Sequence, residues 1–171
     1  HEDYPKGNYN NKLIEFFKKN FINKKTKFLL FTYHPIPKLG NLNLKNFKVC
    51  LNALKYLSTK GWKIIITYPN FDPGYESIIK EIKRLKQNGN ITIVKNLGQK
   101  LYFSILNYIG NNNGFCIGNS SSGIKETMFF NCKVLNLGIR QQSRLKSKNV
   151  FNCKINKDEI KKLFMKKLSK K

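Results

Sequence analysis

Short runs of apolar, β-branched or aromatic residues alternate along this chain with longer amphipathic stretches. The short runs predict five β-strands, at residues 28–33, 63–68, 91–95, 114–118 and 133–138. The longer stretches repeat apolar residues at helical spacing. They predict helices at residues 10–21, 43–61, 74–90, 99–114, 121–131 and 157–171.

This alternation predicts an α/β fold with a parallel sheet and helices on both faces. Because crossovers between parallel strands are right-handed, a doubly wound, Rossmann-like arrangement follows. In such sheets ligands bind at the carboxyl ends of the strands. The residues that follow each apolar run are therefore where chemistry is expected. The chain of 171 residues is long enough for one domain and shows no internal repeat.

The composition is strongly basic, with 33 Lys and Arg against 9 Asp and Glu and a formal net charge of +24. Such a charge is typical of nucleic-acid-binding proteins, so a basic nucleic-acid-binding module is one alternative. However, the lysines are spread over the whole chain and accompany many asparagines, as in an A/T-rich genome. Nucleic-acid sites also favour Arg for its forked contacts. We therefore expect no specific nucleic-acid partner.

Neither the cysteines nor the apolar runs indicate a metal site or a membrane segment. The four cysteines lie far apart, and two histidines cannot complete a zinc set. We predict reduced, buried thiols, with a disulfide or a metal as the lesser alternative, at Cys50, Cys116, Cys132 and Cys153. No apolar run approaches the roughly 20 residues of a membrane span, and the first residues lack a signal-peptide core. A soluble, cytoplasmic protein is expected, and the missing initial Met suggests a piece of a longer chain.

Polar residues follow the first two predicted strands. Pro35 disfavours helical backbone at the preceding residue, so the first strand should end in an exposed His34. His34 is either a surface histidine or a group that titrates near neutrality in a site. The second strand is followed by "TYPNFDPG", where a rigid turn fully accounts for Asp72 and Gly74. Asn70 is less well explained by that turn.

The stretch "FCIGNSSSGIKETMFF", residues 115–130, leads from a strand into a helix. A helix N-terminus with glycines and hydroxyls binds phosphate well, but serine is also an ordinary N-cap. Glu126 lies at capping-box spacing from none of the three serines, Ser120, Ser121 and Ser122. A carboxylate one turn inside a phosphate-binding helix can accept the hydroxyls of a ribose. Nucleotide binding is therefore favoured over capping alone.

Two of the three arginines, Arg140 and Arg144, follow the fifth predicted strand. In a composition so rich in Lys, an Arg suggests a need for its planar fork, as for a diphosphate. The strand ends together offer a phosphate cradle, a ribose acceptor, forked cations and a histidine. We interpret them as a nucleoside diphosphate site, most simply for a nucleotide sugar. The sequence carries neither a dinucleotide-binding G-x-G-x-x-G after the first strand nor a P-loop.

Five strings in this sequence resemble the UDP-N-acetylglucosamine 2-epimerases in order and spacing: "TYHP", "TYPNFDPG", "NLGQ", "IGNSSSGIKE" and "LNLGIRQQSR". The resemblance covers about residues 28–155 and is to the hydrolysing branch. The non-hydrolysing branch carries His-Arg and Asp-Ser-Gly-Gly where this chain has His-Pro and Gly-Asn-Ser-Ser-Ser-Gly. The resemblance implies a GT-B-type enzyme of two Rossmann-like domains. Residues 1–171 would be its C-terminal, UDP-binding domain, without the N-terminal half.

The resemblance also implies roles for single residues. Ser120, Ser121 and the backbone at Gly123 would hold the diphosphate at the helix N-terminus. Glu126 would accept the ribose hydroxyls, and Arg140 would lie at the phosphates.

Three further residues acquire roles by the same resemblance. His34 would lie beside the sugar as a catalytic or phosphate-binding group. Backbone around Leu97 would meet the uracil, and Asn70 would lie near the nucleotide.

The reaction of the resembled family eliminates UDP across C1–C2 and hydrates the resulting glycal with inversion at C2. It gives N-acetylmannosamine and UDP for the synthesis of sialic-acid-type sugars. Its acid and base carboxylates would lie in the absent half, so the isolated chain should bind UDP weakly without turnover. No cofactor is implied. The implied partners are a UDP-sugar, the N-terminal domain and, for the whole enzyme, further copies.

Two alternatives to this reaction stay open from the sequence. One is an epimerase of UDP-diacetylbacillosamine, since nothing in this half separates the two sugars. The other is the UDP-sugar-binding half of a GT-B glycosyltransferase.

Overall fold

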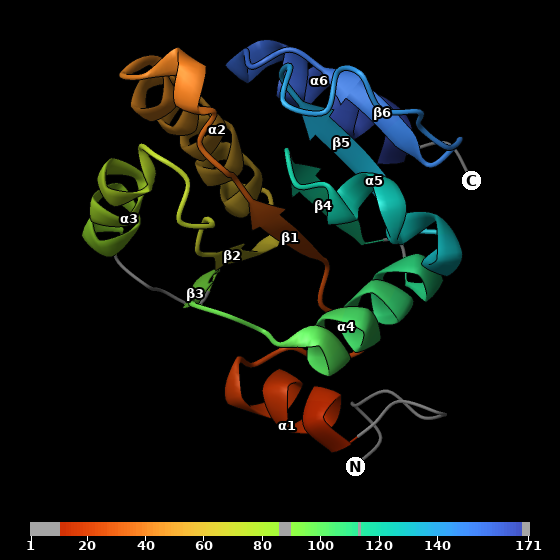
Figure 1. Ribbon diagram of the computed structural model, residues 1–171. Coiled ribbons are helices and arrows are strands. Elements are labelled where there is room, and N and C mark those ends of the chain that lie inside the picture. Colours follow the sequence, from red (N-terminus) through yellow and green to blue (C-terminus); the bar gives the residue numbers. More distant parts are fainter. Residues whose placement is uncertain (1–10, 86–89, 113, 169–171) are drawn as a thin grey trace.

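The computed structural model describes residues 11–85, 90–112 and 114–168 (Figure 1). Within these residues six parallel strands form one sheet in the order β3-β2-β1-β4-β5-β6. The strands are β1 (Phe28–Thr32), β2 (Lys63–Thr67), β3 (Ile91–Val94), β4 (Phe115–Gly118), β5 (Lys133–Leu137) and β6 (Val150–Cys153). The predicted α/β, Rossmann-like fold class is confirmed.

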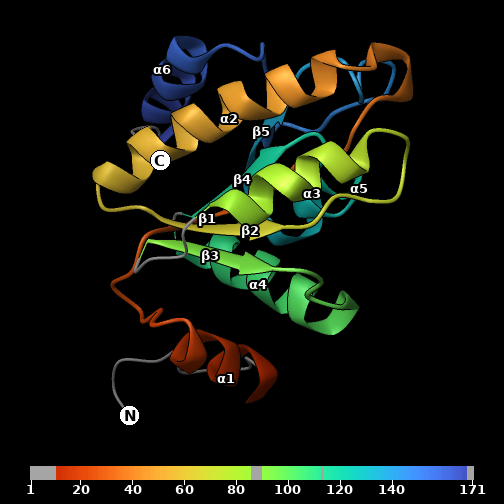
Figure 2. The same ribbon diagram turned by 90° about the vertical axis from the view of Figure 1, so that its left-hand side faces the viewer.

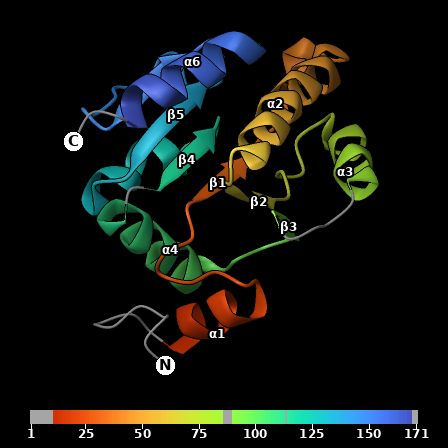
Figure 3. The same cartoon turned by 180° about the vertical axis from the view of Figure 1, so that it is seen from behind.

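Helices cover both faces of this sheet (Figure 2). One layer contains α2 (Leu42–Thr59), α3 (Tyr75–Arg84) and α6 (Lys157–Leu168). Within it, α2 and α6 lie side by side (Figure 3). The other layer contains α1 (Asn11–Lys19) and α4 (Gln99–Asn111). The remaining helices are the short α5 (Ser122–Lys125) and the 3₁₀ helices η1 (Pro37–Leu39) and η2 (Thr127–Phe130).

The central strand β1 shows why these runs are apolar throughout. Leu29 and Phe31 pack into the core beneath α2 and α6, whereas Phe28 and Leu30 pack into the core beneath α1 and α4. Successive side chains of a strand point to opposite faces, so a strand covered on both faces needs apolar residues at every position.

Several elements differ from the sequence-based prediction. The 3₁₀ helix η1 was not predicted, and the helix predicted at residues 74–90 ends at Arg84, while residues 86–89 of that prediction lie outside the described residues. The edge strand β6 was not predicted, because of its four residues only Cys153 is buried and Asn152 is exposed. The helix expected at residues 121–131 is a four-residue α5 followed by η2. Thr127 Oγ1 donates to the carbonyl of Gly123 at 2.8 Å, and such a bond to the preceding turn bends helices.

The chain adds β2 and β3 on one side of β1, and then β4, β5 and β6 on the other side. Gly118, at the end of β4, makes the close pairing of β1 with β4 possible. A Cβ on Gly118 would lie 2.0 Å from the carbonyl oxygen of Thr32, and its φ is +149°. Only glycine fits so close to a neighbouring strand. The loop after β4 therefore begins directly beside the end of β1, at the switch point where such sheets bind ligands.

Candidate functional site

A cleft of about 860 Å³ lies at the carboxyl ends of β1, β2 and β3, beside α4 and the loop that follows β4. Residues from five separate segments of the chain line it. They include five of the residues singled out from the sequence: His34, Asn70, Leu97, Ser120 and Glu126. The fold thus brings these positions, which are distant in sequence, to one surface.

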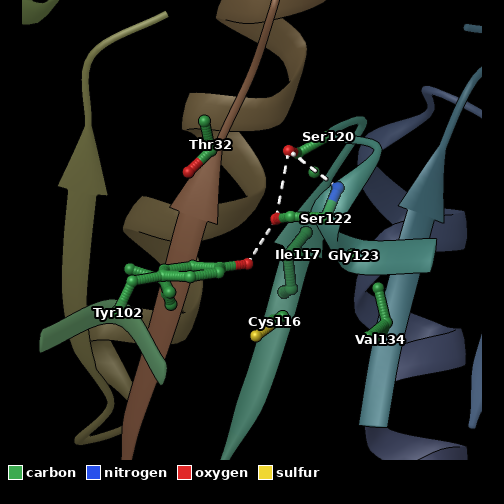
Figure 4. Close-up of a pocket in the computed structure, with 10 residues that line it drawn as sticks. Thr32, Tyr102, Cys116, Ile117, Ser120, Ser122, Gly123 and Val134 are labelled. Atoms are coloured by element: carbon green, nitrogen blue, oxygen red, sulfur yellow. Dashed lines mark hydrogen bonds between the residues drawn. The ribbon is translucent and has the colours of Figure 1, made fainter. Parts of the chain in front are cut away.

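The other three predicted residues lie beside the cleft. Ser121 is the N-cap residue of α5, and Ser122 lines the cleft in its place. Gly123 lines an adjoining cavity of about 30 Å³ beneath the loop (Figure 4). Arg140 does not line the cleft and donates to the loop backbone at the carbonyl of Asn119. Sequence reasoning could not separate Ser122 from its neighbours, because three consecutive serines carry the same signal.

Hydroxyl groups link α4 to this loop, as Figure 4 shows. Tyr102 Oη and Ser122 Oγ form a hydrogen bond, and Ser122 Oγ lies 3.3 Å from Ser120 Oγ. The backbone N–H of Ser122 also donates to Ser120 Oγ at 3.3 Å. Burial raises the pKa of Tyr102, so its hydroxyl stays neutral. Tyr102 was missed because, in the sequence, it belongs to the apolar face of a helix.

His34 is held on both its backbone and its ring. Asn119 Oδ1 accepts from the His34 N–H at 2.7 Å, and Asn119 Nδ2 donates to the His34 carbonyl at 2.8 Å. The ring nitrogen Nδ1 accepts from the backbone N–H of Asn70 at 2.9 Å.

These contacts leave His34 half-buried instead of exposed as expected. Burial first, and then the nearby Arg140 cation, lower the pKa of His34 from 6.5 to about 4, against the opposing effect of Asp72. The expectation that His34 titrates near neutrality is therefore wrong. Its imidazole is neutral at pH 7.

Asp72 and Arg140 connect the loops that follow β2 and β5. Arg140 Nη2 lies 3.8 Å from Asp72 Oδ2, and Arg140 Nη1 donates to the carbonyl of Asn119 at 3.1 Å. Asn70 Nδ2 donates to the same Asp72 oxygen at 2.8 Å. The turn alone does not account for Asp72, contrary to the sequence interpretation. The scarcity of Arg pointed to Arg140, but no sequence pattern named its distant partner.

On the side of the cleft near β3 and α4, fewer polar groups have hydrogen-bond partners within the described part of the chain. Glu126 is half-buried, and among the described residues its carboxylate has no hydrogen-bond partner. Leu97 precedes Gly98, whose N–H donates to Asn96 Oδ1 at 2.8 Å in a tight turn with positive φ. The ring of Phe103 lines the same side. This side therefore offers an apolar surface, open backbone and one unpaired carboxylate.

Other features bear on the alternatives raised by the sequence. In the part of the chain that the structure describes, no group of three His, Cys, Asp or Glu is placed to hold a metal ion. All four cysteines are buried, as predicted, and free. No helix among residues 11–85, 90–112 and 114–168 combines the length and apolar character needed to cross a bilayer.

The sequence matches, over residues 6–171, the family described as UDP-N-acetylglucosamine 2-epimerase. It is 35% identical over 153 residues to the GDP/UDP-N,N'-diacetylbacillosamine 2-epimerase (hydrolyzing) of Campylobacter jejuni, covering 80% of this chain and 38% of that protein. It is 31% identical over 135 residues to the UDP-N,N'-diacetylbacillosamine 2-epimerase (hydrolyzing) of Legionella pneumophila, covering 78% and 34%. The chain thus spans less than two fifths of the length of these relatives.

Solved structures share the fold at low sequence identity. The UDP-GlcNAc 2-epimerase of Methanocaldococcus jannaschii aligns with a TM-score of 0.71 and 17% identity, over 95% of this chain and 44% of that one. The S. aureus MnaA-UDP co-structure aligns with a TM-score of 0.67 and 16% identity, over 97% and 41%. These likenesses support the fold and its GT-B-like character.

Proposed function

Since the chain belongs to the UDP-N-acetylglucosamine 2-epimerase family, in its hydrolysing branch, we propose that its cleft holds the UDP part of a UDP-linked 2-acetamido sugar. The observation that carries this proposal is the convergence of His34, Ser120, Ser122 and Glu126 on one cleft at the switch point of the sheet. The cleft is thus lined both by hydroxyl donors, from Ser120 and Ser122, and by an acceptor without a partner among the described residues, Glu126, as a nucleoside diphosphate requires.

The diphosphate is assigned to the loop after β4. Among the described residues, the backbone N–H groups of Ser120 and Ser121 have no hydrogen-bond partner. The hydroxyls of Ser120 and Ser122 lie beside them. Because α5 has only four residues, its dipole is small, and these individual donors supply most of the attraction. Gly123 lets the backbone approach the anion, and Arg140 contributes positive charge from behind the loop.

The nucleoside is assigned to the opposite side. Glu126 accepts the ribose hydroxyls, because its unpaired carboxylate lines the cleft one turn beyond the phosphate loop. Backbone around Leu97 meets the uracil, next to the ring of Phe103. Asn70 lies between this side and His34, near the nucleotide.

The proposed reaction is loss of UDP across C1–C2 of the sugar, followed by hydration with inversion at C2. It needs an acid and a base that face the sugar. Of the described residues that line the cleft, Glu126 is the one carboxylate, and it is assigned to the ribose. We therefore assign the acid and base groups to a second, Rossmann-like domain of the whole enzyme. We further propose that this two-domain enzyme is cytoplasmic and oligomeric and uses no cofactor. The 171 residues alone bind UDP without turnover.

Two sugars are candidates for this enzyme. UDP-N-acetylglucosamine is supported by the family description. It is also supported by a match of 30% identity over 98 residues to the UDP-N-acetylglucosamine 2-epimerase of Neisseria meningitidis, covering 57% of this chain and 25% of that protein. UDP-N,N'-diacetylbacillosamine is favoured by the two relatives of 35% and 31% identity that carry its name. Incubating the two-domain enzyme with each sugar nucleotide, and measuring free UDP, separates them.

Calorimetry on the 171-residue chain tests the binding proposal. UDP should bind at least tenfold more tightly than uridine, because charge-assisted bonds to the diphosphate are lost in uridine. Equal affinity for the two would reject the phosphate loop.

Activity is tested by following UDP release from both sugar nucleotides. The chain alone should release none above background, and the two-domain enzyme should release UDP together with the free 2-epimerised sugar. A new glycosidic bond as the product would instead support a glycosyltransferase.

A further inference from the structure

Asn119 occupies an unusual position between the cleft and the core. Its side chain is buried, with 1% of its surface exposed, although it is polar. The amide uses its oxygen and its nitrogen on the two backbone polar groups of one residue, His34, at 2.7 and 2.8 Å. The backbone carbonyl of Asn119 accepts from Arg140 Nη1 at 3.1 Å and from Gln141 Nε2 at 3.2 Å. One residue thus holds both the histidine and the arginine of the site.

This arrangement extends the pairing of β1 and β4 beyond the strands themselves. The last paired residues are Thr32 and Gly118, and the Asn119 N–H still donates to the Thr32 carbonyl at 3.3 Å. Beyond this pair, the side-chain amide of Asn119 makes the hydrogen bonds to the His34 backbone that a neighbouring strand would otherwise make. Because Pro35 has no N–H, the segment after His34 has one fewer donor with which to fix itself. The orientation of His34 therefore depends on Asn119.

The ring of His34 is fixed by a second contact. A backbone N–H can only donate, so the bond from Asn70 N–H to Nδ1, at 2.9 Å, requires Nδ1 to be unprotonated. The neutral ring then carries its hydrogen on Nε2. The ring lines the cleft, and among the described residues Nε2 has no partner. The charged groups that act on the ring are Arg140 and Asp72.

We infer that Asn119 is a positioning residue that holds His34 as a neutral Nε2–H donor at the cleft. His34 then stabilises the departing diphosphate through a hydrogen bond and does not act as the base that removes a proton from the sugar. The identity of this acceptor rests on the proposed function. The tautomer and the role of Asn119 do not, because they follow from contacts in the free chain.

Nuclear magnetic resonance of the ¹⁵N-labelled chain tests the inference without a ligand. The chain has only two histidines, and the other is residue 1, so the His34 ring is readily identified by its loss in His34→Gln. We expect one neutral tautomer at pH 7.5, with Nε2 protonated and Nδ1 bare. We also expect no protonation of the ring down to pH 5. A protonated Nδ1, or an averaged mixture of tautomers, would overturn the inference.

Two variants test Asn119 itself. Asn119→Ser removes the paired amide, and the nearly isosteric Asn119→Asp places an acceptor against the His34 carbonyl. In both, the ring should sample both tautomers and titrate closer to pH 6.5. The matched control is Asn136→Ser, which alters another buried asparagine, on β5, whose amide donates to Asn152 Oδ1 at 3.0 Å instead of to His34. It should leave the ring signals unchanged, and unchanged signals in folded Asn119 variants would refute the positioning role.

Adding UDP separates this inference from the proposed function. If UDP binds and the Nε2–H signal shifts, both stand. If calorimetry shows binding while the Nε2–H signal does not move, His34 is not a donor to the diphosphate. If UDP does not bind at all, the proposed function fails, and the ligand-free spectra still decide the role of Asn119.

Discussion

The two walls of the cleft are built in opposite ways. The switch-point wall is formed by His34 and Asn70, which line the cleft, and by the residues that hold them from outside it: Asp72, Asn119 and Arg140. Their polar groups bond mostly to one another. The wall formed by Leu97, Phe103 and Glu126, which we call the nucleoside wall after its proposed ligand, offers apolar surface and a carboxylate without a partner among the described residues.

The difference indicates a division of labour. Groups that stabilise developing charge work best when neighbouring bonds fix them beforehand, because no reorganisation is then needed during the reaction. Groups that select a ligand contribute most when they are unsatisfied until it arrives, since the ligand then supplies their missing bonds. Changes in the switch-point wall should therefore alter protonation and geometry. Changes in the nucleoside wall should alter affinity alone.

The largest expected effect concerns the switch-point wall and pH. The pKa of His34 is about 4 in the folded chain against 6.5 for a free side chain, so between these values the unfolded chain binds a proton that the folded chain does not. The free energy of unfolding should thus fall as the pH falls from 6.5 to 4, by up to about 3 kcal/mol from this group. Urea titrations at several pH values measure it.

The matched variant for this test is His34→Gln, because carboxylates also titrate in the window. The difference between the two pH profiles isolates the histidine. Parallel profiles would mean that the ring is not protected, and the contrast between the two walls would lose its basis.

The second effect separates the serines of the loop. Ser120→Asp should weaken UDP binding at least about a hundredfold, since a carboxylate near a diphosphate at an effective dielectric constant of about 20 costs several kcal/mol. Aspartate is tolerated at helix starts, so the fold should persist. Ser121→Asp should cost less, because Ser121 does not line the cleft. Calorimetry compares them, and equal losses would show that charge near the loop matters and position does not.

The smallest effect sharpens the nucleoside wall. Glu126→Gln keeps the shape but weakens the acceptor, and a charged hydrogen bond is worth roughly 1.5–3 kcal/mol. Affinity for UDP should fall about tenfold while the melting temperature stays unchanged. Glu76→Gln, on the exposed surface of α3, is the control and should change neither. A lower melting temperature with full affinity would make Glu126 a structural residue.

The fold was largely predictable because its signal is local. Each predicted strand lies within one residue of the observed strand at either end, since a run such as residues 28–32 must be apolar on both faces of a covered sheet. The strand β6 was not predicted because it is a short edge strand with polar positions. The helix after β4 was predicted too long, because a single threonine hydroxyl competes with its backbone bonds.

The candidate site was predictable only as far as strand ends reveal it. The carboxyl-edge rule led to His34, Ser120 and Glu126, which all line the cleft. Two interactions join residues from different strand ends. They are the ion pair of Asp72 with Arg140 and the hydrogen bonds of Asn119 to the backbone of His34. Such pairs depend on the register between strands and leave no periodic trace in one sequence.

The close approach of Gly118 to Thr32 also bears on how this domain folds. Leu29 pairs with Phe115, so joining β1 to β4 closes a loop that contains β2, β3 and three longer helices. Contacts so distant in sequence form slowly, because the chain entropy of closure is lost before they contribute. The cleft does not exist until this long-range pairing is made. A ligand of the cleft therefore stabilises only the completed sheet, and its binding during refolding reports the moment at which the two halves of the sheet join.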